Sequence, residues 1–264
     1  MADTLVRFEV VDGVAVLTLD DAPANTYTHQ MMRDLDDAIL QARFDENVHV
    51  IVLRGAGSKF FCAGADISML RDSDPYFKYN FCLHANETLV RLEQTPKLVI
   101  AALNGHTVGG GLEIAMACDL RIARRDSGKI GLPEVKLGVL PGTGGTQRLG
   151  RMVGKSKAIE LMAEGNVFGF EDARAMGMVN RILDGDADDF MAQVMDYARG
   201  FVPPSTASAA VGRIKRSVQS GVEVSFSEGL AIERELQQLL FQGQDAKEGL
   251  AAYLEKRAPE FSGR

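Results

Sequence analysis

Three consecutive glycines, Gly109 to Gly111, stand directly before an apolar run with a single acid, Glu113, in the stretch NGHTVGGGLEIAMACDL. Because no helix breaker follows the glycines, we expect a helix to begin within them. The first amides of a helix lack partners inside it, and glycine lets a ligand approach them closely. A carbonyl oxygen that gains negative charge would fit there, and one such donor is worth about 3 kcal/mol in a transition state. The same glycines could instead only allow tight packing of a helix on a strand.

Two glutamates could transfer protons. Glu113 has apolar neighbours near the expected helix start, and desolvation there would raise its pKa towards the range useful for general acid–base catalysis. Glu134 follows Pro133 in IGLPEVKLGVLPG and therefore lies in a predicted loop. Each has an ordinary alternative, since Glu113 could face solvent at a helix N-terminus and Glu134 could be an exposed loop residue.

Other motifs argue against several site types. The glycine-rich stretch GTGGTQRLG (142–150) has neither the spacing of a P-loop nor that of a dinucleotide fingerprint, so we expect no nucleotide-phosphate loop. Cys62, Cys82 and Cys118 fit neither a disulfide framework nor a metal knuckle. They are predicted to be buried reduced thiols, and no metal site is expected.

Composition limits the partners of the chain. With 264 residues, of which 46% are hydrophobic and 25% charged, it is long enough for one large domain with a substantial core. A net charge of -7 makes a general attraction to nucleic acid or to an anionic membrane unfavourable. The N-terminus MADTLVRFEV resembles no secretory signal, and no apolar run approaches membrane-spanning length. A cytoplasmic location is expected.

Alternation of strand and helix patterns predicts an α/β layered domain over residues 5–185. Runs rich in β-branched residues predict strands at 13–20, 48–55, 97–105, 119–125 and 178–183. Apolar residues at three- and four-residue intervals predict helices around 31–40 and 159–162.

The character of the chain changes at GFVPPSTAS (200–208). We therefore expect a core over 1–200 and a helical region over 201–264, with helices at 205–219, 225–242 and 245–257. Three helices cannot bury all their apolar faces alone, so this region should pack against the core or another subunit. The widest apolar surface is formed by Leu230, Ile232, Leu236, Leu239, Leu240 and Phe241.

Three blocks taken together resemble the enoyl-CoA hydratase/isomerase, or crotonase, superfamily. They are FFCAGADI (60–67), IAALNGHTVGGGLEIAMACDL (100–120) and LPEVKLGVLPGTGGTQRL (132–149), and ordered similarity runs from PANTYTHQMM to EKRAPEF. The resemblance implies a spiral of repeated β-β-α units followed by a helical trimerisation region, in a homotrimer or a hexamer made of two trimers. It also implies an acyl-CoA thioester as substrate, with no metal or redox cofactor because coenzyme A is part of the substrate.

Matching the motifs position by position gives the catalytic residues that the resemblance implies. The amides of Ala65 and Gly110 would form an oxyanion hole, Glu113 would activate water, Glu134 would protonate C2, and Gly142 would help to hold the water. The two acids are 21 residues apart, so the fold must bring them together. The presence of both favours hydration of a 2-enoyl-CoA to a 3-hydroxyacyl-CoA. The alternatives are another reaction of the superfamily, such as double-bond isomerisation or C–C bond hydrolysis, and an acyl-CoA-binding protein without activity.

The resemblance also implies residues that bind coenzyme A. Lys59, Asp66 and Ile67 match positions near the adenine nucleotide, and Tyr253 and Lys256 match C-terminal positions that reach coenzyme A from a neighbouring subunit. A lysine on a flexible stem suits a phosphate, although each of the two could instead be a solvated surface charge. The segment LDDAPANTY carries two aspartates where many relatives have a basic residue, which argues against a phosphate contact there.

The acyl group should contact residues 68–92, where the superfamily varies most. Phe77, Phe81, Thr88 and Leu92 approximate one helical stripe, which favours ordinary core packing. An aromatic pocket for a bulky acyl group is the alternative.

Overall fold

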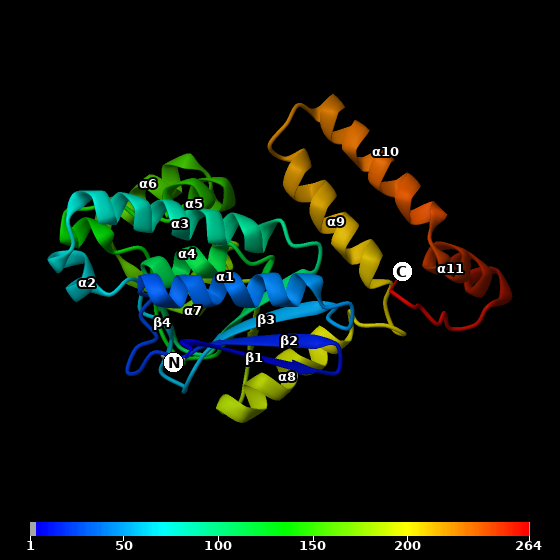
Figure 1. The fold of residues 1–264 in the computed structure, drawn as a ribbon, viewed down its shortest axis with the longest axis horizontal. Coiled ribbons are helices and arrows are strands. Elements are labelled where there is room, and N and C mark those ends of the chain that lie inside the picture. Colours follow the sequence, from blue (N-terminus) through cyan, green and yellow to red (C-terminus); the bar gives the residue numbers. More distant parts are fainter. Residues whose placement is uncertain (1–3, 264) are drawn as a thin grey trace.

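The larger of two sheets forms the centre of the molecule. The computed structural model describes residues 4–263 (Figure 1). This sheet has the strand order β1-β2-β3-β5-β7-β10 and is parallel except for the antiparallel pair β1–β2. The strands are β1 (Val6–Val11), β2 (Val14–Leu19), β3 (Val50–Gly55), β5 (Leu98–Leu103), β7 (Leu120–Arg124) and β10 (Arg181–Leu183).

The smaller sheet receives the second strand of each repeated unit. Its order is β4-β6-β8-β9. The strands are β4 (Phe60–Cys62), β6 (His106–Val108), β8 (Ile130–Gly131) and β9 (Val167–Phe168). Because β3, β5 and β7 lie in the larger sheet and β4, β6 and β8 follow them in the smaller one, the chain forms the predicted spiral of β-β-α units.

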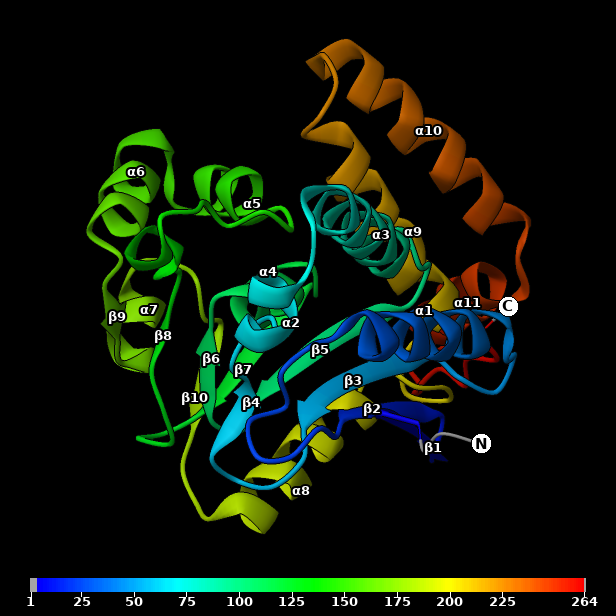
Figure 2. The same ribbon diagram turned by 60° about the vertical axis from the view of Figure 1, so that its left-hand side comes forward.

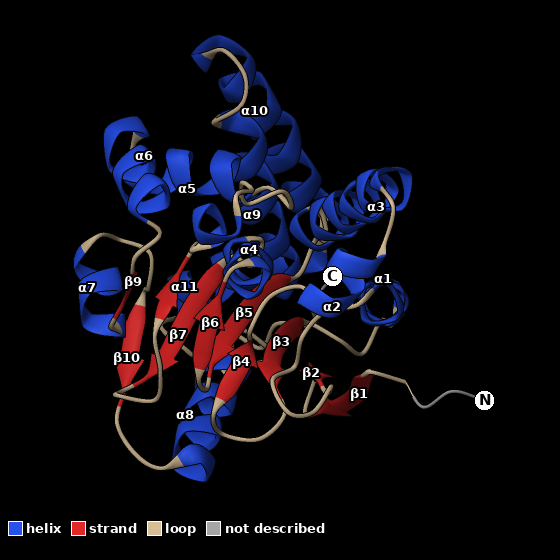
Figure 3. Ribbon diagram, turned by 90° about the vertical axis from the view of Figure 1, so that its left-hand side faces the viewer, coloured by secondary structure: helices blue, strands red, loops and turns tan. Residues whose placement is uncertain are grey.

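Helices cover both faces of the larger sheet (Figures 2 and 3). On one side are α1 (His29–Phe44), α2 (Ile67–Asp72), α3 (Pro75–Glu93) and α4 (Gly110–Met116), and on the other is α8 (Ala187–Arg199). The remaining elements before residue 200 are the 3-10 helix η1 (Glu134–Leu137), α5 (Gly145–Val153), α6 (Lys155–Glu164) and α7 (Phe170–Ala175).

Two apolar cores result from this layering. Successive residues of a strand point to opposite faces, and a sheet covered on both faces needs continuous apolar strands. In β3, Ile51 and Leu53 belong to the core under α1, α3 and α4, whereas Val50 and Val52 belong to the core against α8. All six residues of β5 are buried, so the run that predicted this strand serves both cores.

The predicted strands at 13–20, 48–55, 97–105 and 119–125 are confirmed as β2, β3, β5 and β7. The strand predicted at 178–183 is wrong in its first half, because only Arg181–Leu183 pairs with β7. The Met178 carbonyl instead accepts a hydrogen bond from Nε of the buried Arg121, at 2.7 Å, and the Met178 amide donates to Ala173 at the end of α7.

The C-terminal helices are α9 (Ser208–Gly221), α10 (Phe226–Gln242) and α11 (Gln244–Glu255), as the sequence predicts. They project from the α/β part in Figure 1, and α10 contacts α9 and α11 but has no buried residue. The C-terminal region packs on the core through α9, whose Lys215 pairs with Asp119 at 2.8 Å, as one of the two predicted arrangements requires. Contact of the exposed apolar surface of α10 with another subunit stays a prediction. The boundary at residue 200 also stays a prediction.

Two further observations concern the whole chain. Cys62 and Cys118 are buried free thiols as predicted, but Cys82 is only half-buried because it faces the loop at Gly142. Over residues 4–263, no helix is long and apolar enough to cross a membrane.

Candidate active site

The three glycines are required by close approach of other segments. Gly109 has a φ of 57°, in the left-handed region, and its amide donates to the Gly131 carbonyl of β8 at 2.9 Å. A Cβ atom at Gly110 would lie 2.1 Å from Cε1 of Tyr27, and one at Gly111 would lie 2.1 Å from the Cys62 carbonyl oxygen. Close packing is therefore one reason for these glycines, the donor role of the Gly110 amide stays a prediction, and α4 begins at Gly110 as expected.

The predicted oxyanion segments lie against each other. A Cβ atom at Gly64 would be 3.1 Å from the Gly110 nitrogen, so the turn that carries Ala65 lies beside the first residue of α4. Within the described part of the chain, neither the Ala65 nor the Gly110 amide donates a hydrogen bond to another protein group. Two such amides suit an oxygen that gains charge, and their role stays a prediction.

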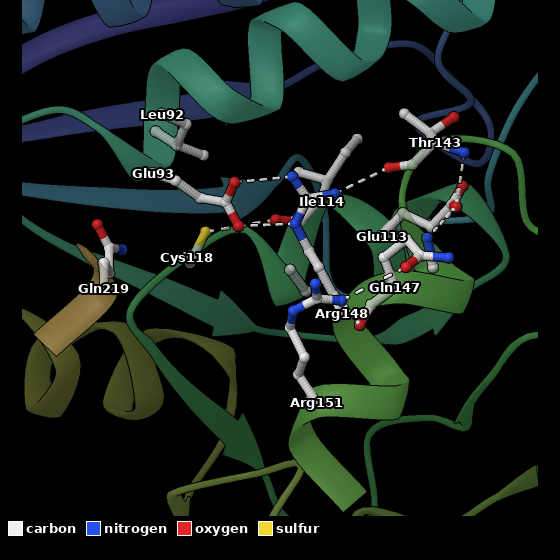
Figure 4. A network of polar contacts seen from close by, with 12 residues as sticks. Leu92, Glu93, Glu113, Ile114, Cys118, Thr143, Gln147, Arg148, Arg151 and Gln219 are labelled. Carbon is white, nitrogen blue, oxygen red and sulfur yellow. Dashed lines mark hydrogen bonds and ion pairs between the residues drawn. The ribbon is translucent and has the colours of Figure 1, made fainter. Parts of the chain in front are cut away.

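Glu113 is a buried carboxylate rather than a solvent-facing one. Its residue is 2% exposed, and its Oε1 accepts hydrogen bonds from the amides of Thr143 and Gly145, both at 2.7 Å (Figure 4). Burial raises the pKa of Glu113, whereas the two amides and the positive charge of Arg148 lower it. A desolvated carboxylate with defined donors can act as a base at a fixed position.

Glu134 is the first residue of η1, and its carboxyl group points inwards. Its Oε2 is buried and has no hydrogen-bond partner among the residues described, while its Oε1 lies 3.1 Å from the Cβ position of Gly109. Burial, together with a smaller contribution from the negative charge of Glu113, raises the pKa of Glu134 to about 7. The exposed-loop alternative is therefore wrong, and the fold brings both acids to the start of α4.

An ion pair behind Glu113 holds the loop that binds it. The guanidinium of Arg148 donates to both carboxylate oxygens of Glu93, at 2.7 and 2.8 Å, and Nη1 donates to the Thr143 carbonyl at 3.0 Å (Figure 4). The sequence reasoning missed Arg148, Glu93 and Thr143. An arginine in the first turn of a helix that follows a glycine loop was visible, but its partner on α3 was not.

Gly142 contributes a carbonyl group to the site. That carbonyl accepts a hydrogen bond from Nδ2 of Asn86 at 3.2 Å. The amides that bind Glu113 belong to Thr143 and Gly145, and the predicted role of Gly142 towards water stays a prediction.

Three of the residues predicted to bind coenzyme A belong to the segment of β4 and α2, where Lys59 precedes β4 and where Asp66 and Ile67 directly follow Ala65. The Lys59 ammonium lies 5.5 Å from the centre of the Phe60 ring. Asp66 caps α2 by accepting a hydrogen bond from the Met69 amide at 2.8 Å, and Ile67 is 54% exposed at the start of that helix. These positions leave Lys59 and Ile67 accessible to a ligand.

Tyr253 and Lys256 lie far from that group within one chain. Tyr253 is 83% exposed on α11, and Lys256 ends that helix in a left-handed conformation. Figure 1 places α11 and α2 at opposite ends of the molecule. Contact of these two residues with coenzyme A therefore needs a neighbouring subunit and stays a prediction.

The aromatic stripe of α3 packs mainly inside the molecule. Phe81 is buried and stacks on Tyr27, with ring centres 5.5 Å apart, and Phe77 stacks on Phe81 at 6.1 Å. Core packing is thus confirmed at Phe81, and Phe77 is half-buried. Among residues 4–263, no group of three or more His, Cys, Asp or Glu side chains is arranged to hold a metal ion.

Known proteins resemble the chain over nearly its whole length. A family model described as enoyl-CoA hydratase/isomerase matches residues 9–264. A Bacillus subtilis protein named a probable enoyl-CoA hydratase is 37% identical over 251 residues, which are 95% of this chain and 95% of that protein. The short-chain-enoyl-CoA hydratase of Clostridium acetobutylicum is 36% identical over 248 residues, 94% of this chain and 93% of that protein.

Solved structures agree with these relatives. The crystal structure of an enoyl-CoA hydratase from Geobacillus kaustophilus superimposes with a TM-score of 0.95 at 42% identity, covering 100% of this chain and 98% of that one.

Proposed function

The chain belongs to the enoyl-CoA hydratase/isomerase family, and on that premise we propose that it adds water across the C2=C3 double bond of a 2-enoyl-CoA thioester, reversibly giving a 3-hydroxyacyl-CoA. The observation that carries the proposal is the pair of buried acids at the start of α4. Hydration needs one group that activates water and a second that protonates C2. Glu113 and Glu134 differ in surroundings in the way that this division requires.

The amides of Ala65 and Gly110 bind the thioester oxygen in this proposal. Polarisation of the carbonyl group makes C3 electrophilic, and the two donors stabilise the enolate that forms when water adds there. The lack of other acceptors for these amides in the described chain supports this assignment. Gly109 and Gly110 keep the approach clear because they carry no side chain.

Glu113 activates the water. Both loop amides donate to its Oε1, so Oε2 is the oxygen that can accept a hydrogen bond from a water molecule. As the water attacks C3, its proton passes to the Glu113 carboxylate. The amides of Thr143 and Gly145 hold the carboxylate still, which keeps the water aligned with the bond.

Glu134 donates the proton to C2. Its pKa of about 7, caused mainly by burial, keeps a large fraction of the carboxyl group protonated near neutral pH. In the reverse reaction the same carboxylate removes the proton from C2. The addition of water is redox-neutral and both proton transfers are assigned to glutamates, so we propose that no metal or redox cofactor takes part.

The assembly is part of the proposal. Exposed apolar side chains on the C-terminal helices include Val222, Phe226 and Leu254, which are 73%, 81% and 80% exposed. Such a surface is costly in water and favours contact with further copies of the chain. A homotrimer, or a hexamer of two trimers, is proposed, to be measured by light scattering after size-exclusion chromatography. A cytoplasmic location stays a prediction from the sequence.

Hydration of crotonyl-CoA, followed as loss of the enoyl-thioester absorbance, tests the proposal. Glu113→Gln and Glu134→Gln should each abolish most of the activity while binding of the thioester survives, and Glu9→Gln, at an exposed position on β1, is the matched control. If short, medium and ring-containing enoyl-CoA esters all remain unhydrated, the proposal is wrong. A shifted double bond or a cleaved carbon–carbon bond in the product would assign another reaction of the family, and binding without turnover would assign an acyl-CoA-binding protein.

A further inference from the structure

Tyr27, in the connection between β2 and α1, pairs with the turn that carries Ala65. Its amide donates to the Gly64 carbonyl at 3.0 Å, and its carbonyl accepts from the Asp66 amide at 3.2 Å. The Ala65 amide lies between these two bonds and takes part in neither. The backbone of Tyr27 therefore fixes the orientation of the peptide that is proposed to bind the thioester oxygen.

The ring of Tyr27 packs on the second proposed donor. A Cβ atom at Gly110 would lie 2.1 Å from Cε1 and 2.6 Å from Oη, so the ring touches the backbone at the start of α4. The residue is 3% exposed, and the stack with Phe81 closes the other side of the ring. The ring thus has no room to swing away from Gly110.

The hydroxyl group of Tyr27 reaches the loop that binds Glu113. Its Oη lies 3.0 Å from Oγ1 of Thr143, and the Thr143 amide donates to Glu113. Burial and the negative charge of Glu113 raise the pKa of Tyr27 well above its usual value, so the phenol keeps its proton. The phenol can therefore donate to Thr143 and leave the Thr143 hydroxyl proton free to turn towards Glu113, whose pKa that hydroxyl lowers.

One residue therefore contacts all three parts of the proposed site, through its backbone, its ring and its hydroxyl group. We propose that Tyr27 is a positioning residue that holds the two oxyanion amides and the Glu113 carboxylate in register, an inference that rests on the proposed hydratase function. Tyr27 acts through Thr143 and Gly110, not on the reacting atoms. Its loss should change both the rate and the titration of Glu113.

Other ionisable groups lie near Glu113 or Tyr27 and belong in any pH argument. Arg148 on α5 lowers the pKa of Glu113, and Glu134 on η1 is coupled to Glu113 by charge. The thiols of Cys82 on α3 and Cys62 on β4 stay neutral, because burial raises the pKa of Cys82 and raises that of Cys62 to about 12. None of these groups changes in a variant that removes only the Tyr27 hydroxyl.

The test is Tyr27→Phe, which keeps the ring, its stack on Phe81 and the backbone bonds. Loss of one hydrogen bond predicts a kcat for crotonyl-CoA hydration about fivefold lower, with little change in KM. Without the Tyr27 hydroxyl, nothing holds the Thr143 hydroxyl in the orientation that donates to Glu113, which disfavours the charged form of Glu113 and raises its pKa. The acid limb of the kcat–pH profile should therefore move to higher pH. The alkaline limb, which reports Glu134, should stay in place.

Controls separate this role from a general structural one. Tyr197→Phe, on α8 across the larger sheet from the proposed site, keeps the ring contact with Phe201 and should change nothing. Thr143→Ser should retain activity. Thr143→Val removes the bond to Tyr27 and also the hydroxyl that lowers the pKa of Glu113, so its effect should be at least as large as that of Tyr27→Phe. The double variant Tyr27→Phe/Thr143→Val should be no worse than Thr143→Val alone, because the Tyr27 hydroxyl is proposed to act through Thr143.

The titration of Glu113, followed by NMR of isotope-labelled glutamate carboxyl groups, supplies a readout that needs no substrate. A raised Glu113 pKa in Tyr27→Phe supports the inference, and an unchanged pKa overturns it even if the wild-type protein hydrates no substrate. A wild-type protein that hydrates crotonyl-CoA, with a Tyr27→Phe variant of equal rate and pH profile, would overturn the inference and leave the proposed function intact.

Discussion

Gly110→Ala is the substitution for which the structure gives the most definite expectation. The new Cβ atom would lie 2.1 Å from Cε1 of Tyr27, whereas ordinary contacts begin at 3.4 Å, so one of the two groups must move by more than 1 Å. Tyr27 is buried against Phe81 and cannot yield, so the start of α4 should shift. Overpacking of this kind costs about 1–3 kcal/mol of folding stability.

The same shift displaces the proposed oxyanion donor. A lost donor of this type lowers kcat by about 100- to 1,000-fold. A domain of ordinary stability that loses about 1–3 kcal/mol stays almost entirely folded, so unfolding cannot account for a fall in rate of that size. We therefore expect a folded protein with a strongly reduced kcat for crotonyl-CoA hydration. Thermal unfolding and circular dichroism measure the first effect, and initial rates measure the second.

Gly150→Ala is the matched control. Gly150 lies inside α5, and nothing lies within 4 Å of its Cβ position. Alanine is the better helix former by about 0.5–1 kcal/mol, so this variant should be fully active and slightly more stable. A Gly110→Ala protein with a lowered midpoint of unfolding but a kcat within about threefold of wild type would refute the assignment of the Gly110 amide.

Three further outcomes follow from charged groups of known surroundings. Because burial raises the pKa of Glu134 to about 7, its carboxyl group keeps its proton below that pH and loses it above. The kcat for hydration should therefore fall as the pH rises through about 7. A flat kcat–pH profile up to about pH 9 would contradict the role of Glu134 as proton donor. In Arg148→Lys the new side chain cannot reproduce the paired hydrogen bonds to Glu93 together with the bond to the Thr143 carbonyl. Calorimetry should show a free energy of unfolding lower by about 1–2 kcal/mol, and kcat should fall because the loop that binds Glu113 is released. Unchanged stability and kcat would count against the role of Arg148 in holding this loop. Lys215→Met removes the ion pair, at 2.8 Å, of the Asp119 carboxylate, whose side chain is 12% exposed. The free energy of unfolding, measured in urea, should fall by about 3 kcal/mol because a buried charge is left unpaired. The double variant Lys215→Met/Asp119→Asn should recover part of that loss, and no recovery would show that the unpaired charge is not the cause.

The strands β2, β3, β5 and β7 of the larger sheet were predictable because burial on both faces demands long apolar runs. The edge strand β1 was missed, since most of its residues are exposed and no such run marks it. The smaller sheet was not predictable either, since β4 has three residues and β8 only two, too few to show any periodicity. These short strands exist because their partners come from neighbouring turns of the spiral. The start of α3 is visible in the sequence, because Asp74 followed by Pro75 is a helix start signal. In the structure Asp74 does cap this helix.

The acids of the site could be found from the sequence, but their supports could not. Glu113 stands out as one charge in an apolar run. The groups that bind it are the amides of Thr143 and Gly145, and an amide has no side-chain signature. Tyr27 is 116 residues away from its partner Thr143, and only the packing of β4, α3 and α4 around its ring reveals the contact.

The residues around the two glutamates could not by themselves divide the proton-transfer roles, which only the family resemblance assigned, because both glutamates have apolar neighbours. The difference arises from the number of donors that the fold supplies: Glu113 receives two amides and faces Arg148, and Glu134 receives no donor at its buried Oε2. Glu113 therefore ionises more readily, and its negative charge then raises the pKa of Glu134. Since the first ionisation opposes the second, the favoured state near neutral pH has one carboxylate and one protonated carboxyl group, which is the state that the addition of water requires.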